Sequence, residues 1–161
     1  MTVNIKFAKL RPTATIPSKN LEDAGYDCYA DFEEEFIVIE SLETRLVPLG
    51  IASAFSDDYY FQIHERGSTG SKGIKYGAGV IDSGYRGEWL LPITNANRKP
   101  LMITKDENFS SDDYIVYPYS KAICQAVLLP VPKTSIEEIS YEDLSAIPSL
   151  RGKGKLGSSN K

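Results

Sequence analysis

The sequence predicts an all-β fold. Short runs rich in Val, Ile, Tyr and Phe recur along the chain, and Gly, Pro, Asn or Asp mark most of the breaks between them. Closely spaced runs with turn residues between them are typical of β-sandwiches and barrels. A chain of 161 residues has the length of one domain and can bury a substantial core.

Eight segments have the composition of strands. In chain order they cover residues 3–10, 36–39, 45–55, 59–64, 88–94, 101–104, 113–117 and 122–131. A further segment, 23–30, opens a strand with an acidic residue beside a glycine. Only residues 136–146 can form a helix, and that helix is short.

The composition changes near Pro148. We therefore expect a β domain over residues 1–147 and a flexible, Gly/Lys-rich segment over residues 148–161. Residues 151–161 carry four positive charges and no acidic residue. Such a segment is either a solvated, disordered chain end or a wrap for a polyphosphate. It is not a Walker A loop, because Ser158 stands where that motif requires Lys.

Composition and charge exclude several classes of protein. The net charge of −4 and the pI of about 5.1 argue against a nucleic-acid binder. No apolar run is long enough to span a bilayer, and the first residues lack a secretory apolar region, so we expect a cytoplasmic protein. One histidine and no paired-cysteine motif rule out a His-rich or CxxC zinc site. Cys28 and Cys124 have apolar neighbours, which predicts reduced core residues.

Residues 79–88 carry the most informative pattern. An apolar run, Gly79 to Ile81, delivers Asp82 at a tight Ser-Gly turn, and a tyrosine and an arginine follow at once. Two extended arms around Ser-Gly predict a β-hairpin. Asp82 is either an ordinary turn residue or a carboxylate held in place to act as a general base.

A second segment, residues 65–70, follows a predicted strand. Its Arg66, Gly67 and Ser68 offer a guanidinium, a hydroxyl and flexible backbone donors. Such groups bind phosphate, although an ordinary polar loop has the same composition.

Taken together and in order, these segments resemble the five motifs of the trimeric dUTPase family. The resemblance spans nearly the whole chain, and the third motif is the most specific. The five motifs cover residues 24–30, 66–68, 79–88, 122–125 and 151–159.

The resemblance implies a distorted, jelly-roll-like β-barrel of the β-clip type that forms a homotrimer with active sites between subunits. It implies hydrolysis of dUTP to dUMP and pyrophosphate, which clears dUTP from the nucleotide pool and supplies dUMP for dTMP synthesis. Asp82 matches the general base, and Tyr85 matches the ring that packs against deoxyribose. Asp27 would sit near a Mg²⁺ ion, through water.

The remaining motif residues match substrate-binding positions. Backbone groups near Gly79 and Ile81 would read the uracil edge. The phosphates would be held by Arg66, Gly67, Ser68 and Gln125. The C-terminal segment would close over the nucleotide from another subunit, with Arg151, Leu156, Gly157 and Ser158.

Four substitutions depart from the family pattern. Gly67 stands where a serine usually follows the arginine, with Ser68 after it, and Lys121-Ala122 replaces an Asp-Arg pair. In the C-terminal motif Leu156 replaces a stacking phenylalanine, and Lys155 replaces a usual glycine. Residues 98–119 are longer than in many relatives and contain a polar insert. Because some phage relatives with extra segments here bind regulatory proteins, the resemblance also suggests a protein partner at this insert.

Two other functions remain open. A dCTP deaminase belongs to the same fold superfamily, but Asp82 followed by Tyr85 argues against it. A regulatory binding protein could use the nucleotide as a switch. Release of pyrophosphate from dUTP, compared with release of ammonia from dCTP, separates these alternatives.

Overall fold

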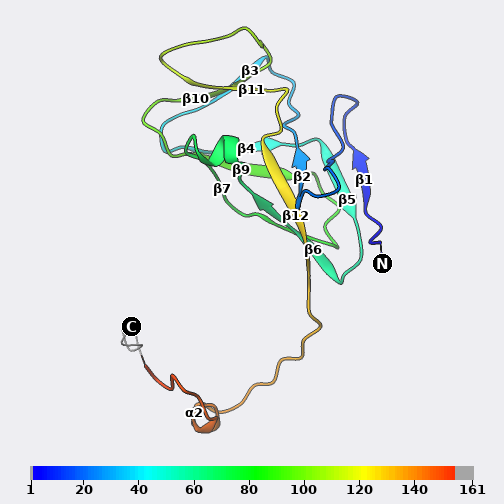
Figure 1. Cartoon of the computed structure of the whole chain (residues 1–161), viewed down its shortest axis with the longest axis vertical. Coiled ribbons are helices and arrows are strands. Elements are labelled where there is room, and N and C mark those ends of the chain that lie inside the picture. Colours follow the sequence, from blue (N-terminus) through cyan, green and yellow to red (C-terminus); the bar gives the residue numbers. More distant parts are fainter. Residues whose placement is uncertain (1, 155–161) are drawn as a thin grey trace.

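A computed structural model describes residues 2–154 (Figure 1). Twelve strands and two short helices make up this part of the chain. In order, they are β1 (Lys6–Lys9), β2 (Gly25–Cys28), β3 (Phe36–Ile39), β4 (Thr44–Pro48), β5 (Ile51–Ala54), β6 (Tyr59–His64), α1 (Gly67–Gly70), β7 (Ile74–Tyr76), β8 (Val80–Asp82), β9 (Leu90–Asn95), β10 (Leu101–Thr104), β11 (Ile115–Pro118), β12 (Cys124–Pro130) and α2 (Tyr141–Ala146).

The strands form four small sheets. Their orders are β1-β5, β11-β10-β3, β2-β12-β6-β8 and β4-β9-β7. All pairings between these strands are antiparallel except that of β10 with β11, which are joined by the polar loop 105–114. The all-β class expected from the sequence is therefore confirmed.

The predicted strands 36–39, 59–64 and 101–104 match β3, β6 and β10 residue for residue. The predicted strand 45–55 is two strands, β4 and β5, which separate at Gly50. Gly50 has a φ of 66°, and a Cβ there would collide with the carboxylate of Asp31. The chain bends where only glycine fits this left-handed conformation.

The helix expected over 136–146 forms only as α2. Ser140 is in an extended conformation, and its hydroxyl accepts a hydrogen bond from the backbone N–H of Asp143 at 3.0 Å. The helix therefore begins after Ser140, which acts as its N-cap. The preceding residues, 136–140, form no helix.

The core lies between the sheets and is centred on aromatic side chains. Phe61 and Trp89 are fully buried, with ring centroids 5.3 Å apart, and Phe7 packs against both. Trp89 Nε1 donates to the hydroxyl of Ser53 at 3.1 Å, which satisfies its polar atom.

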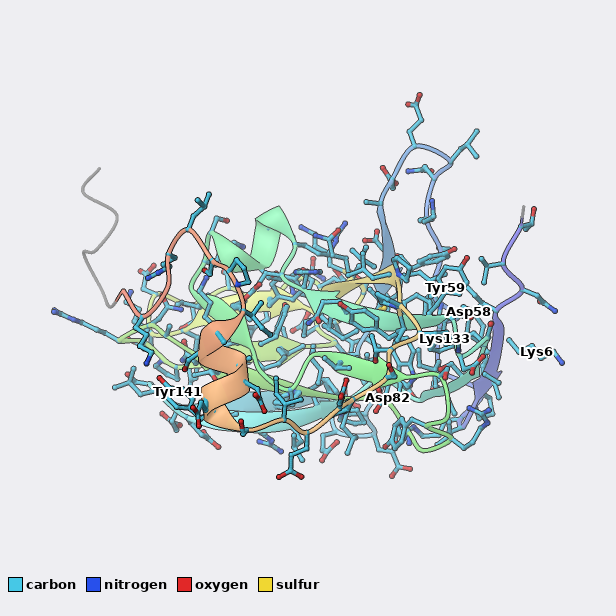
Figure 2. The ribbon with its side chains drawn as sticks, turned by 90° about the horizontal axis from the view of Figure 1, so that it is seen from below. Lys6, Asp58, Tyr59, Asp82, Lys133 and Tyr141 are labelled. Atoms are coloured by element: carbon cyan, nitrogen blue, oxygen red, sulfur yellow. The ribbon has the colours of Figure 1, made fainter. Side chains whose placement is uncertain are left out.

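After β12 the chain leaves the β body, and α2 lies well away from it (Figure 1). Lys133 anchors the departing segment, because its ammonium pairs with Asp57 at 2.8 Å and with Asp58 at 3.4 Å. Figure 2 shows Lys133 beside Asp58. Every residue from 131 to 153 is exposed in the single chain. The domain boundary expected at residue 147 stays a prediction.

Candidate active site

The motif residues gather at two separate surface cavities. The first has a volume of about 610 Å³ and is lined by Asp27, Arg66, Gly67, Ser68 and Gln125, together with the acidic side chains of Glu22 and Asp23. It thus combines a guanidinium, backbone donors and carboxylates. We call it the Arg66 cavity.

Two neighbours orient the Arg66 guanidinium. Its Nε lies 2.9 Å from Oδ1 of Asp27, and its Nη2 donates to Oδ2 of the same carboxylate at 3.1 Å. Its Nη1 donates to the carbonyl oxygen of Ala122 at 3.2 Å. A bidentate pair with a carboxylate fixes the plane of a guanidinium. Three of the five N–H groups are used in this way.

The turn after Arg66 presents backbone donors. Thr69 is buried, and its hydroxyl accepts from the backbone N–H of Arg66 at 3.0 Å, which closes the short helix α1. The N–H groups at the start of a helix have no acceptor within that helix. Those of Gly67 and Ser68 border the Arg66 cavity. A Cβ at Gly67 would meet no atom within 4 Å, so the backbone there is open to a ligand.

Gln125 joins the cavity through strand pairing. On β12 it lies opposite Asp27 of β2 and His64 of β6. Its Nε2 donates to the carbonyl of Glu65 at 2.7 Å. A Cβ at Gly25 would lie 2.6 Å from Oε1 of Gln125, which explains the glycine next to the acidic residues.

The second cavity, about 220 Å³, surrounds Asp82 and includes Ile81, Tyr85, Glu88 and Leu90. We call it the Asp82 cavity. The N–H of Tyr85 donates to the carbonyl of Asp82 at 3.1 Å and closes the expected turn. Asp82, labelled in Figure 2, is exposed, and within residues 2–154 its carboxylate accepts no hydrogen bond.

Tyr85 folds back over the turn. Its hydroxyl donates to the carbonyl of Glu88 at 2.9 Å, and its ring occupies the space that a Cβ of Gly87 would need. Tyr85 is 43% exposed and lines the same cavity as Asp82, so it can contact a ligand there.

The β-hairpin expected around Asp82 is wrong. β8 pairs with β6, whereas β9 pairs with β4 and β7. The chain after the turn runs toward β5 instead of back along β8. The backbone N–H of Trp89 donates to the carbonyl of Ile51 at 2.9 Å. The carboxylate of Glu88 accepts hydrogen bonds from Arg11 and from the N–H of Gly50. Asp82 therefore sits at the end of one strand and at a turn, without a paired second arm.

Gly79 lies where β8 approaches β6 closely. Its carbonyl accepts from the N–H of Ile63 at 2.7 Å. A Cβ at Gly79 would lie 2.8 Å from Nε2 of Gln62 and 3.0 Å from the carbonyl oxygen of Ile63, so no side chain fits. The side chain of Ile81 is buried in the core. What these residues offer a ligand at the surface is backbone, not side chain.

One sheet carries both cavities, and its register gives their separation. Asp82 lies opposite Tyr60 of β6, whereas Asp27 lies three strands away, level with His64. With about 3.3 Å per residue and about 4.8 Å between strands, the Cα atoms of the two residues are about 20 Å apart. A triphosphate, three phosphorus atoms long, cannot bridge that distance within one chain.

The two cysteines lie directly behind the Arg66 cavity. Cys28 and Cys124 are free, fully buried and opposite one another on β2 and β12. A hydrogen bond with Cys28 and burial raise the pKa of the Cys124 thiol well above its ordinary value. The core position expected for both cysteines is confirmed.

The C-terminal motif is described only in part. Arg151 is exposed, and its Nε donates to the carbonyl of Gly154 at 3.3 Å. Leu156, Gly157 and Ser158 lie outside the described residues. Among the described residues, no helix combines the length and the apolar character needed to cross a membrane.

Sequence reasoning missed several residues of the two cavities. Glu22 and Asp23 line the first, and Glu88 and Leu90 line the second. The sequence offered one signal for two of them, because Asp23 directly precedes the first motif and Glu88 ends the third. No sequence signal could have shown the contact of Ala122 with Arg66, since that contact uses a backbone carbonyl.

Comparison with known proteins decides the family. The dUTPase family model matches residues 11–160. The chain belongs to the dUTPase family. A deoxyuridine 5'-triphosphate nucleotidohydrolase of Nautilia profundicola is 32% identical over 163 residues, which cover 99% of this chain and 100% of that relative. The family resemblance inferred from the five motifs is confirmed.

Solved structures of the family share the fold. A mutant dUTPase of Staphylococcus bacteriophage 80alpha with dUpNHpp gives a TM-score of 0.75 at 22% identity, covering 97% of this chain and 98% of that chain. A mutant dUTPase from phage phi11 of S. aureus, described with a structural Mg(II) ion, gives 0.66 at 20% identity, covering 84% and 96%. The jelly-roll-like fold expected for the family is therefore confirmed.

Proposed function

We propose that this member of the dUTPase family hydrolyses dUTP to dUMP and pyrophosphate with Asp82 as the general base. The observation that carries the proposal is the division of the motif residues between two cavities. One offers donors suited to phosphate, and the other offers, beside an aromatic ring, a carboxylate that accepts no hydrogen bond within residues 2–154. Asp82 takes a proton from water as that water attacks the α-phosphorus, and the bond to the bridging oxygen breaks to release pyrophosphate.

The separation of about 20 Å supports a site shared between subunits of a homotrimer. The Arg66 cavity of one chain would face the Asp82 cavity of another, so that both halves act on one nucleotide. Closed cyclic assemblies place the same pair of surfaces at each interface. Three such sites follow from three chains.

The phosphates would lie in the Arg66 cavity. The two N–H groups of Arg66 that remain after its contacts with Asp27 and Ala122 supply charge-assisted donors. Gly67 and Ser68 add backbone N–H groups, and Gln125 borders the same cavity. Fixed donors stabilise the negative charge that develops on the polyphosphate, without solvent reorganisation.

The residues around Asp27 fit a Mg²⁺ ion that is bound mainly through the substrate. Mg²⁺ keeps several waters and uses one or two carboxylates plus substrate phosphates. Asp27 offers one carboxylate at the cavity, and within residues 2–154 no group of three His, Cys, Asp or Glu side chains could hold a metal by itself. When bound, the ion neutralises charge on the phosphates. Asp27 would hold it through water.

The remaining assignments concern the nucleoside and the lid. The ring of Tyr85 would pack on the deoxyribose and leave no room for a 2′-hydroxyl. Backbone groups at Gly79 and Ile81 would read the uracil edge. Arg151 and the segment with Leu156, Gly157 and Ser158 would close over the nucleotide from another subunit and exclude bulk water.

The reaction itself is tested with the full chain and two substrates. We expect pyrophosphate and dUMP from dUTP, and no ammonia from dCTP. Ammonia from dCTP without pyrophosphate from dUTP would replace the proposal with a deaminase. Tight binding of dUTP without turnover would instead indicate a nucleotide-switched regulatory protein. A protein partner at residues 98–119 stays a prediction.

The shared site is tested by mixing two inactive chains. Asp82→Asn lacks the base, and a chain ending at Ser149 lacks Arg151 and the lid. In randomly mixed trimers each site receives an intact base and an intact lid with odds of about one half each, so about one quarter of the activity should return. Native mass spectrometry confirms mixing. No recovery in proven mixed trimers would contradict subunit sharing and leave the reaction untouched.

A further inference from the structure

The hydroxyls of two tyrosines, the buried Tyr117 and the half-buried Tyr76, hold the backbone that contacts Arg66. The hydroxyl of Tyr117 donates to the carbonyl of Ala122 at 2.6 Å, and this is the same carbonyl that accepts from Nη1 of Arg66. The hydroxyl of Tyr76 donates to the next carbonyl, that of Ile123. We call these two hydroxyls and the two carbonyls the carbonyl brace.

The brace joins elements that are distant in the chain. Tyr117 is the last residue but one of β11 and is only 1% exposed, and Tyr76 ends β7. The backbone N–H of Ile123 donates to the carbonyl of Cys28 on β2 at 2.8 Å. The peptides on either side of Ile123 are therefore fixed from three directions before β12 begins.

The hydroxyl of Tyr76 is suited to remain a donor. Burial raises the pKa of Tyr76, so its proton stays in place across the working pH range. A carbonyl oxygen has two lone pairs, so that of Ala122 can accept from Tyr117 and Arg66 at once. Neither hydroxyl lines the Arg66 cavity, so each can affect a ligand only through the backbone it holds.

We propose that Tyr117, supported by Tyr76, is a positioning residue for the reaction. By holding the carbonyl of Ala122, it fixes the third contact of the Arg66 guanidinium and aims the two remaining N–H groups at the phosphates. This inference rests on the proposed function of the Arg66 cavity. Asp27 alone fixes one edge of the guanidinium, and the Ala122 carbonyl fixes the other. Preorganised donors bind without paying for their own ordering.

The test compares two ligands, four single variants and one double variant. Tyr117→Phe and Tyr76→Phe each remove only a hydroxyl, Arg66→Ala removes the group being positioned, and Tyr119→Phe is the matched control. Tyr119 lies two residues from Tyr117, and its hydroxyl binds Asp31 instead, at 3.3 Å. The ligands are dUpNHpp, which keeps the triphosphate chain, and dUMP, which lacks the two outer phosphates.

We expect Tyr117→Phe to weaken dUpNHpp binding about threefold to tenfold, the range for one hydrogen bond, and to leave dUMP binding unchanged. Tyr76→Phe should act in the same direction and less strongly, because it releases the neighbouring carbonyl. Tyr119→Phe should change neither Kd. In the Arg66→Ala background, Tyr117→Phe should cause no further loss, because its effect passes through the missing side chain.

Three results would overturn the brace. One is equal weakening of dUMP and dUpNHpp by Tyr117→Phe, and another is an additive loss in the double variant. The third is an unchanged Kd for dUpNHpp. If Tyr117→Phe does not fold, the same cycle with Tyr76→Phe decides. Failure of the proposed function gives a different result. In that case the Arg66→Ala variant would bind dUpNHpp with the same Kd as the wild-type chain.

Discussion

The Arg66 cavity and the Asp82 cavity are built in opposite ways. Around Arg66 the chain supplies partners in advance, because Asp27, Ala122 and the brace hold the guanidinium on two edges. Asp82 stands exposed at a turn, and within the described residues its carboxylate has no hydrogen-bond partner. A cation that holds phosphate gains from being fixed, whereas a base must keep a lone pair free for a proton.

The difference also concerns how each site is anchored to the body. Asp27 and Gln125 lie opposite one another inside a sheet. The Asp82 turn is anchored after it ends, where Glu88 binds Arg11 and the N–H of Gly50. The proposed base, Asp82, is thus placed by a strand on one side and by an ion-paired network on the other.

Replacing Asp82 with Asn is the most direct test of the contrast between the two cavities. An amide cannot accept the proton of the attacking water, so we expect kcat to fall by about 10²–10⁴. Binding of dUpNHpp should persist, because the donors of the Arg66 cavity are intact. Asp113→Asn, in the exposed loop 105–114, is the matched control. A kcat near that of the wild type would end the assignment of Asp82.

Replacing Asp31 with Asn tests the anchor of the turn. Asp31 is buried and accepts from Nε of Arg11 at 2.6 Å, and Arg11 also holds Glu88. Loss of one partner of a largely buried pair should lower the free energy of unfolding by about 2–4 kcal/mol. Unfolding in urea measures this free energy. Lys105→Met, which removes a different charged group, is the comparison. Equal losses of unfolding free energy in the two variants would contradict the role of Asp31 as an anchor of the turn.

The same residue predicts a pH dependence. Burial raises the pKa of Asp31, but hydrogen bonds from Thr13 and Arg11 outweigh burial and leave the pKa below its ordinary value of 3.8. A carboxyl with a lowered pKa in the folded state contributes stability that is fully present above its unfolded pKa. That contribution should be lost as the pH falls below about 4, and Asp31→Asn should flatten this part of the curve.

Tyr85 tests whether the Asp82 cavity selects the sugar of the nucleoside. Tyr85→Ala removes the ring beside Asp82 and should narrow the preference for dUTP over UTP by about 10- to 100-fold in kcat/KM. Tyr85→Phe keeps the ring and loses only the bond to the carbonyl of Glu88. It should keep the preference. If Tyr85→Ala leaves the ratio unchanged, another residue excludes the 2′-hydroxyl.

The smallest effect is expected in the lid, at a position outside the described residues. Leu156→Phe adds a ring that can stack on uracil, worth about 0.5–1.5 kcal/mol. The Kd for dUpNHpp should fall accordingly, and Leu156→Met should leave it near the wild-type value. Weaker binding in the phenylalanine variant would show that the lid is shaped around leucine.

Much of the fold could be predicted from local sequence. β3, β6 and β10 are β-branched and aromatic runs between clear turn residues, and their bounds were predicted correctly. The break at Gly50 could not be predicted, because one glycine in a long apolar run does not show that Asp31, 19 residues earlier, occupies the space of its side chain. Its cause is tertiary.

The site, too, could be predicted where local sequence was enough and could not be predicted where tertiary contacts decide. Side-chain types in order were enough to propose Asp82, Tyr85, Arg66 and Gln125, and the comparisons confirm the family they indicated. Sequence could not show that the arms around Asp82 separate, because the partners of β8 and β9 lie elsewhere in the chain. It could not show the brace either, since every residue has a carbonyl and only the fold selects which one is used.

The order β2-β12-β6-β8 has a consequence for mixtures of intact and damaged chains. In the proposed trimer one rigid sheet carries the phosphate half of one site and the base half of the next, so the three sites are linked in a ring. A chain with both Arg66→Ala and Asp82→Asn would therefore disable two of the three sites of any trimer that admits it. Such a chain should be a dominant inhibitor, silencing intact partners beyond its own share of the population.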